Sequence, residues 1–368
     1  MKFLRDNIIK IILVFGILIV AIIILIACSG KGGNGVKTTS YSKMEDNFKS
    51  AATRYLSKHR ELLPKEEGKT AKIQMDTIYT EKEMKKMTAI DDPSVRCNGY
   101  VNVSYRVNNK EEKQYRVVPH IKCGDKYETE DLYVHILKNE DLVQELDGLY
   151  KIGDEYIYRG ENPNNFVQIG EHLYRILSID SEGYIKLILA SSAGLSSPWD
   201  NRYNIDTSKY NGINDYSISR ARANLNEFFE SDEFFSETEK NMFVKHSYCV
   251  GKRSQKNLLI NRTEECQETS DEDYVSLPLL YDYFIVSTDS NCKDILDKSC
   301  NNYNYLTSSS KIYTMTGLKE TSYSVYIISE VADLSDASYS RKIRIISYIS
   351  NVSYSSGKGT LEEPYIIK

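Results

Sequence analysis

A long uncharged apolar segment near the N-terminus constrains this chain more than any other feature. Ile11 to Ala27 reads IILVFGILIVAIIILIA, without a charged or strongly hydrogen-bonding side chain. As a helix the segment covers roughly 25 Å, and residues 8–10 extend it to about 30 Å, the thickness of a bilayer core. We therefore expect residues 1–28 to anchor the protein in a membrane, in preference to forming a buried core helix.

The charges that precede the segment predict its orientation. The basic residues outnumber the acidic one: Lys2, Arg5 and Lys10 against Asp6. By the positive-inside rule, the N-terminus stays in the cytoplasm and the body of the chain lies outside the cell. A second hypothesis stays open, because Leu25 to Cys28 resembles a bacterial lipobox, which would make Cys28 a lipidated N-terminus after cleavage. A single-pass helix and a lipid anchor both place residues 29 onward outside the membrane.

Composition indicates a folded, acidic and β-rich body. The 368 residues carry a formal charge of -5, of which residues 1–28 contribute +2, leaving -7 for residues 29–368. An acidic body has no electrostatic reason to bind nucleic acid. The chain has 29 Tyr against 10 Phe and one Trp, and tyrosine favours half-exposed positions in strands.

Six cysteines follow Cys28, an even number that suits an oxidising compartment. Of the 15 possible pairings, joining nearest neighbours is the simplest, which predicts Cys97–Cys123, Cys249–Cys266 and Cys292–Cys300. Free thiols are the alternative. A zinc site is disfavoured, because no C-x-x-C or H-x-x-x-H spacing occurs and the chain has only five histidines.

Residues 41–138 are predicted to form a small α+β domain after a glycine-rich tether at 29–40. A capping box at Ser42 to Glu45 starts an amphipathic helix that runs toward Pro64. A short strand around Ile73 and a second capped helix from Thr80 follow. Alternating apolar residues then predict a β-hairpin closed at its open ends by cysteines: Val101, Val103, Tyr105 and Val107, then Tyr115, Val117 and Ile121.

This N-terminal part resembles the head of a bacterial type IV pilin or pseudopilin. The resemblance rests on the apolar N-terminal segment, the amphipathic helix with Ala51, Ala52 and Tyr55, and the cysteine-flanked hairpin. It covers about the first 138 residues. It implies a pilin-like α+β head.

An acidic connection at 139–147 leads to a second expected domain, residues 148–368. Hairpin patterns dominate it, with a turn at Asp180 to Gly183. Ser217 is predicted to cap a helix whose apolar face includes Ala221, Leu225 and Phe229. A further capping box, Ser236 with Glu239, starts a short helix.

Ordered motifs of this second part resemble a domain of unassigned function found in bacterial surface proteins. They are Gly148 to Tyr150, Tyr158 to Asn162, Leu173 to Ile176, Pro198 to Asn201, Tyr281 to Tyr283 and Gly357 to Thr360. That family is related to the C-type-lectin-like fold shared with formylglycine-generating enzymes. The resemblance implies an α+β, C-type-lectin-like domain over residues 148–368.

Two polar segments of this domain are candidate ligand-binding residues: Glu161, Asn162 and Asn164, and Trp199, Asp200 and Asn201. Carboxylate and amide oxygens of this kind surround calcium in C-type lectins, where the ion binds sugar hydroxyls. Calcium is therefore a possible cofactor and a glycan a possible ligand. The alternative is structural, because Asn, Asp and Pro also form turns and a tryptophan commonly fills a core.

No catalytic signature accompanies these segments. The histidines at 59, 120, 135, 172 and 246 fall in separate elements, and the cysteines that a formylglycine-generating relative would need are accounted for by bridges. The leading hypothesis is therefore a membrane-anchored extracellular protein that binds a glycan, cell-wall or surface-protein ligand without catalysis. A structural subunit of a pilus-like or envelope assembly is the competing hypothesis, and an enzyme the third.

Overall fold

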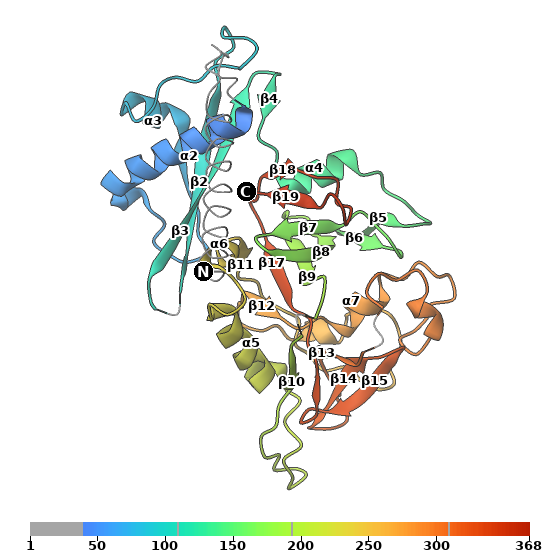
Figure 1. The fold of residues 1–368 in the computed structure, drawn as a ribbon. Helices are drawn as coiled ribbons and strands as arrows, with labels where there is room; N and C mark the ends of the chain where they lie inside the picture. Colours follow the sequence, from blue (N-terminus) through green and yellow to red (C-terminus); the bar gives the residue numbers. More distant parts are fainter. Residues whose placement is uncertain (1–39, 109, 193, 308–309) are drawn as a thin grey trace, which may run out of the picture. The chain divides into compact units, whose positions relative to one another are not determined.

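The computed structural model describes residues 40–368, apart from 109, 193 and 308–309 (Figure 1). The predicted membrane segment, Cys28 and nearly all of the tether lie outside these residues. Within the described part, no helix has both the length and the apolar character needed to cross a bilayer. Residues Tyr41–Lys368 group into one compact unit, and the description below concerns that unit alone.

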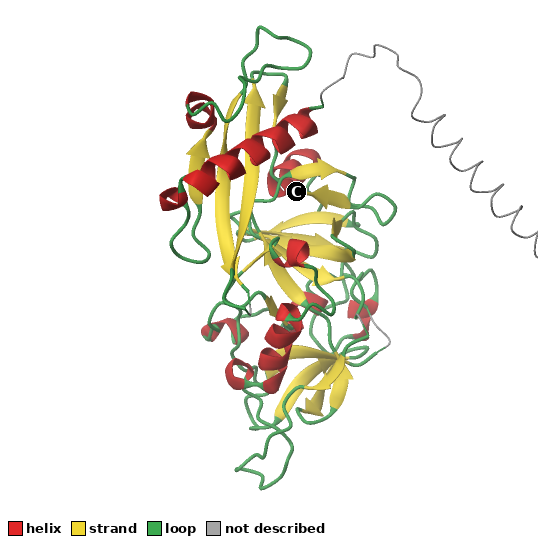
Figure 2. Cartoon of the chain, turned by 60° about the vertical axis from the view of Figure 1, so that its left-hand side comes forward, coloured by secondary structure: helices red, strands yellow, loops and turns green. Residues whose placement is uncertain are grey.

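A four-stranded antiparallel sheet forms the N-terminal part. Its strands lie in the order β1 (Ala71–Gln74), β2 (Asn98–Val107), β3 (Lys113–Cys123) and β4 (Tyr127–Glu128). Helix α2 (Tyr41–Lys58) lies across one face of this sheet, as Figure 2 shows. The predicted hairpin is confirmed as β2 and β3, with Val103 opposite Val117 in the register.

Side chains on β2 and β3 alternate between two faces, as the period of a strand requires. Val101 and Val103 point toward α2, where they pack with Phe48 and Ala52 in a small apolar core. The opposite face carries polar side chains. That second face is the one that positions the site described below.

Two predicted details of this part are wrong. Thr80 does not cap a following helix, because it is the last residue of α3 (Met75–Thr80), and its hydroxyl donates to the Asp76 carbonyl. The expected helix at 83–87 is replaced by turns. Helix α2 also ends at Lys58, and only the 3₁₀ turn η1 (Arg60–Leu62) separates it from Pro64.

The C-terminal part contains two sheets. A ten-stranded sheet follows the path β11-β17-β9-β8-β7-β19-β18, with β12, β5 and β6 attached, and a five-stranded sheet has the order β10-β16-β13-β14-β15. The bounds of the first sheet are β5 (Gly148–Ile152), β6 (Glu155–Arg159), β7 (Phe166–Ile169), β8 (His172–Ile179), β9 (Ile185–Leu189), β11 (Phe243–Val244), β12 (Val275–Ser276), β17 (Ile346–Ile349), β18 (Tyr354–Ser356) and β19 (Tyr365–Ile367). Those of the second are β10 (Ser196–Pro198), β13 (Ile312–Gly317), β14 (Ser324–Ile328), β15 (Ala332–Asp336) and β16 (Ser340–Lys342).

Short helices accompany these sheets. They are α4 (Leu132–Asn139), α5 (Arg220–Glu230), α6 (Glu237–Lys240), α7 (Leu280–Phe284) and the 3₁₀ turns η2 (Tyr216–Ile218), η3 (Glu265–Gln267) and η4 (Lys298–Asn301). The capping box of Ser236 with Glu239 is confirmed at α6. The cap of α5 is Ser219 and not Ser217, because the Ser219 hydroxyl accepts from the Arg222 N–H.

Three disulfides and two cores hold this mixed α+β fold together. All three predicted pairs are present: Cys97–Cys123, Cys249–Cys266 and Cys292–Cys300. One core consists of residues between Met44 and Cys123, and the larger one of residues between Leu132 and Tyr365. The α+β class expected from the sequence is therefore confirmed.

Candidate functional site

The structure places Trp199 and Asp200 inside the larger core. Trp199 is 0% exposed, and its Nε1 donates to the Thr314 carbonyl at 3.0 Å. Asp200 is also 0% exposed, and its carboxylate accepts hydrogen bonds from the Arg202 guanidinium and from the Arg220 N–H. Burial would raise the pKa of Asp200, but these hydrogen bonds lower it overall. Neither side chain is open to a ligand, because protein groups occupy both.

The other predicted segment forms a turn. The main-chain N–H groups of Glu161 and Asn162 donate to the two oxygens of the Asp147 carboxylate, both at 2.8 Å. Asn164 is exposed, while Asn201 accepts from the Arg220 guanidinium. No hydrogen bond or ion pair of the described residues joins 161–164 to 199–201. Among those residues, no group of three or more His, Cys, Asp or Glu side chains is placed to hold a metal ion.

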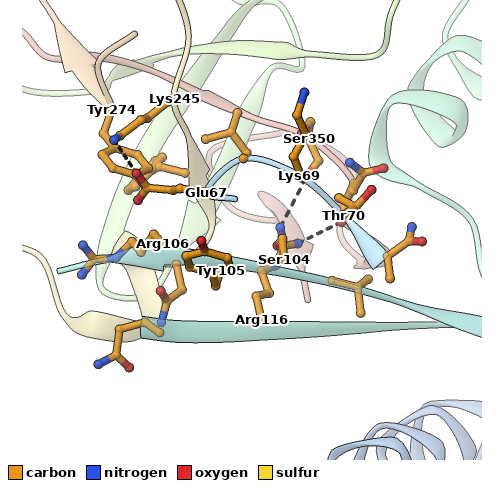
Figure 3. Close-up of a pocket in the computed structure, with 18 of the residues that line it drawn as sticks. Glu67, Lys69, Thr70, Ser104, Tyr105, Arg106, Arg116, Lys245, Tyr274 and Ser350 are labelled. Carbon is orange, nitrogen blue, oxygen red and sulfur yellow. Dashed lines mark hydrogen bonds and ion pairs between the residues drawn. The ribbon is translucent and has the colours of Figure 1, made fainter. Parts of the chain in front are cut away.

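A cavity of about 370 Å³ lies against the polar face of the hairpin (Figure 3). Three cross-strand pairs form this wall: Asn102 with Val118, Ser104 with Arg116, and Arg106 with Gln114. They lie on this face because they alternate with the valines and tyrosine of the opposite one. The local fold of the hairpin thus turns a run of polar residues into one wall of a pocket.

The facing wall comes from the C-terminal part. It contains residues on and around β11, residues next to β12 and the end of β17: Asn241, Phe243, Lys245, Tyr274, Ser350 and Asn351. Residues 67–70, which lead into β1, border the cavity as well. Segments more than 200 residues apart in the chain therefore meet at one cavity, which is where ligand sites commonly form.

Ion pairs fix the ends of these walls. Arg106 is 3% exposed and donates to both oxygens of Glu230 at 3.1 and 3.0 Å and to Glu237 at 2.8 Å. Glu67 lies 2.5 Å from the Lys245 ammonium, a pair visible in Figure 3 beside Tyr274. Burial would raise the pKa of Glu67, but its bonds to Lys245, the Val107 N–H and the Tyr274 hydroxyl lower it overall.

Arg116 places a further positive charge on the hairpin wall. Its guanidinium donates to the Ser350 and Asn351 carbonyls at 3.3 and 2.9 Å, as the dashed lines of Figure 3 mark. Burial lowers the pKa of Arg116 to about 10, so the side chain is still charged at neutral pH. With Lys69, Arg106 and Lys245 against Glu67 and Glu272, the lining residues carry a formal charge of +2, which Glu230 and Glu237 offset where they bind Arg106. Residues 29–368 as a whole carry -7.

Two buried polar atoms of the lining have no hydrogen-bond partner among the described residues. They are the Nε of Arg106 and the Oδ1 of Asn241. A buried polar atom that lacks a partner costs free energy of folding, typically about 1–3 kcal/mol. Both atoms are buried within the protein, so they offer no surface through which a molecule in the cavity could reach them.

The histidines and cysteines contact structural partners. The histidine pairs are His59 with Glu61, His120 with Asp131, His135 with Glu130, His172 with Glu239, and His246 with the Ser247 carbonyl and the Tyr348 ring. The described cysteines are all in disulfides. A reduced cysteine pair of the kind that formylglycine-generating enzymes use is therefore absent from residues 40–368.

Comparison with protein-family models, with curated proteins and with solved structures finds no match to this chain.

The sequence contained one signal for the cavity that the hairpin prediction did not use. The apolar positions of β2 and β3 predict the core, and polar residues alternate with them: Asn102, Ser104, Arg106, Gln114 and Arg116. A strand pair with charged and amide side chains on its second face predicts either a solvated surface or a binding wall. Sequence alone does not decide between these, because the facing wall is built more than 100 residues later in the chain.

Proposed function

We propose that this protein is a membrane-anchored extracellular binding module that takes its ligand in the cavity beside the hairpin. The N-terminal apolar segment supports the location, since it is long enough to span or to direct lipidation. The disulfides support an oxidising exterior. The cavity itself carries the proposal, because charged, amide and aromatic side chains from distant segments converge on it.

We also propose that the N-terminal sheet with α2 is a pilin-like head. Residues 148–368 would be a C-type-lectin-like domain of the bacterial surface-protein type. Binding in the cavity would differ from that of calcium-dependent lectins. Of the two lining carboxylates, Glu67 is engaged by Lys245 and Glu272 is a single exposed group, so direct hydrogen bonds and ion pairs would hold the ligand without calcium.

The test is binding of the full-length protein, in detergent micelles, to an array of cell-wall fragments, glycans and surface peptides, with calcium and with a chelator. We expect saturable binding that survives chelation and is lost in Ser104→Trp, since an indole at Ser104 would project into the cavity and obstruct it. Ser356→Trp, at an exposed serine of β18 outside the cavity, is the matched control. Binding that Ser104→Trp leaves intact would contradict the proposed site.

One observation favours the structural-subunit function as a second candidate. The loop between β10 and η2 exposes large apolar side chains: Tyr203 is 49% exposed, Tyr210 75% and Ile205 83%. Such side chains suit contact with another protein. Sizing after detergent extraction separates the candidates, because a subunit of an assembly would elute at high mass and a solitary binding module would not.

A further inference from the structure

We infer that a basic surface on the N-terminal part binds the anionic phospholipid headgroups of the membrane in which the protein is anchored. The inference rests on the membrane location given under the proposed function. Six exposed cationic side chains define the basic surface: Arg54, Lys58, Arg60, Lys82, Lys85 and Lys86.

Two segments of the chain form the basic surface. Arg54 and Lys58 lie in the last two turns of α2, and Arg60 follows in η1. Helix α3, which leads into residues 82–86, lies beside α2 (Figure 1). The Arg54 guanidinium donates to the Glu83 carbonyl at 2.9 Å, and the Lys58 ammonium lies 2.5 Å from the Glu83 carboxylate. These contacts hold residues 82–86 against the end of α2, so the six cations gather there.

Neighbouring carboxylates offset only part of this charge. Glu83 pairs with both Arg54 and Lys58. With every carboxylate of residues 54–61 and 81–86 included, six cations stand against three acids, a formal charge of +3. Within the part of the chain that the structure describes, no ion pair engages the other four cations: Arg60, Lys82, Lys85 and Lys86.

Apolar side chains accompany the cations. Leu62 follows Arg60 and is 37% exposed, and Met84 and Met87 are partly buried next to the lysines. Helices that bind at a membrane surface combine lysine and arginine with apolar side chains that enter the headgroup region. The basic surface therefore offers lipid both kinds of contact.

The charge of the body is divided unequally between its two parts. Residues 41–138 contain 19 basic and 16 acidic side chains, a formal charge of +3, whereas residues 139–368 contain 23 basic and 35 acidic ones, a formal charge of -12. An anionic bilayer attracts the first part and repels the second. Both effects turn the N-terminal part toward the membrane.

The basic surface is close enough in the chain to reach the bilayer. The glycine-rich sequence at 29–40 predicts a tether that spans about 20 Å. Helix α2 begins directly after it at Tyr41, and Arg54 lies about 20 Å along that helix. None of the six cations lines the cavity beside the hairpin, so lipid and ligand would use separate surfaces.

The experiment measures how accessible Lys85 is in full-length protein reconstituted into vesicles and recovered by flotation. The vesicles contain phosphatidylcholine alone, or phosphatidylcholine and phosphatidylglycerol in equal parts. Reductive methylation with uncharged reagents is followed by peptide mass spectrometry, and Lys298, an exposed lysine of the C-terminal part, is the internal reference.

We expect the methylation rate of Lys85, relative to Lys298, to be about tenfold or more lower in the vesicles that contain phosphatidylglycerol. Each uncompensated cation near an anionic surface favours the bound state about fivefold, so a charge of +3 favours it about a hundredfold. High salt should restore the rate, because it screens the attraction.

Variants locate the effect. Arg60→Gln combined with Lys86→Gln removes two charges of the basic surface and should restore most of the Lys85 methylation rate. Lys256→Gln combined with Lys319→Gln removes two charges from exposed lysines of the C-terminal part and should leave the protection of Lys85 unchanged.

Equal Lys85 rates in the two kinds of vesicle would overturn the inference and leave the proposed membrane location standing. Protection that persists in high salt, or in the Arg60 and Lys86 variant, would overturn it as well, since charge would not be its cause. Protein that floats with neither kind of vesicle would contradict the proposed membrane location, and the inference with it.

Discussion

At the scale of single residues, Asp200 shows how a buried carboxylate serves the fold. The sequence marks Trp199, Asp200 and Asn201 as polar residues next to an aromatic ring, a composition that ligand sites and tight turns share. The structure resolves the ambiguity through Arg202 and Arg220, whose donors surround the carboxylate. These partners are close in sequence, but side-chain identity alone does not say whether the aspartate faces a core or a solvent-filled pocket.

Asp200→Asn is therefore expected to destabilise the protein in a pH-dependent way. The native pKa of Asp200 lies below its usual value, so the ionised form stabilises the folded state above the unfolded pKa of about 3.9. That stabilisation is lost as the pH falls through the native pKa. Urea unfolding should show a loss of about 1–3 kcal/mol at pH 7, which shrinks below about pH 4. The same substitution at exposed Asp206 is the control, and a loss of equal size at both pH values would contradict the prediction.

At the scale of elements, the hairpin β2–β3 was the most predictable part of the chain. Its alternating valines determine the register of the two strands, because a slip of one residue would expose all of them.

Short helices were less predictable. Thr80 and Ser217 both fit the sequence of a cap, but the structure uses their neighbours: Ile78 and Tyr79, which precede Thr80, are buried in α3, and Ser219 caps α5. Tertiary packing thus overrides local capping signals.

Removing the disulfide at the open end of this hairpin should cost more stability than removing the shortest one. In the chain-entropy description the stabilisation grows with the closed loop, and the pairs are separated by 26 residues at Cys97–Cys123 and by 8 at Cys292–Cys300. The double alanine variant of the first pair should lose about 3 kcal/mol, and that of the second about 1 kcal/mol less. Urea unfolding of both variants tests this order, and the reverse order would show that native packing around the short loop dominates.

At the scale of the whole described unit, ion pairs join the two cores. Arg106 lies on β2, while Glu230 ends α5 and Glu237 starts α6. Glu67 and Lys245 form a second connection. Such pairs are invisible in the sequence, since nothing in the neighbourhood of Arg106 indicates an acid more than 120 residues later. For the same reason, the sequence shows the polar face of the hairpin but not the segments that close a cavity over it.

Arg106→Met should uncouple the two cores. It removes the charge-assisted hydrogen bonds of Arg106 to Glu230 and Glu237, whose side chains are 23% and 42% exposed, a loss of about 1–3 kcal/mol. Trp199 is the only tryptophan, so its fluorescence reports on the larger core, and hydrogen exchange of the β2 and β3 amides reports on the smaller one. We expect coincident urea midpoints in the native protein and an earlier midpoint for the hairpin in the variant.

Lys122→Met is the control for this experiment. It removes an exposed ion pair of the same sheet, that of Lys122 with Glu128, whose side chains are 52% and 61% exposed. Exposed pairs contribute about 0–1 kcal/mol, so its midpoints should stay together. Coincident midpoints in Arg106→Met as well would show that packing, and not this ion pair, couples the cores.

The order of the disulfides along the chain bears on how the protein is made. From Cys97 onward, each cysteine that opens a bridge is joined to the very next cysteine in the sequence. A chain whose residues 29 onward cross a membrane in sequence order would therefore present every thiol to its correct partner before the following pair emerged. Each disulfide could then form while the chain is still being secreted. Wrongly paired intermediates, which need an isomerase, would rarely form.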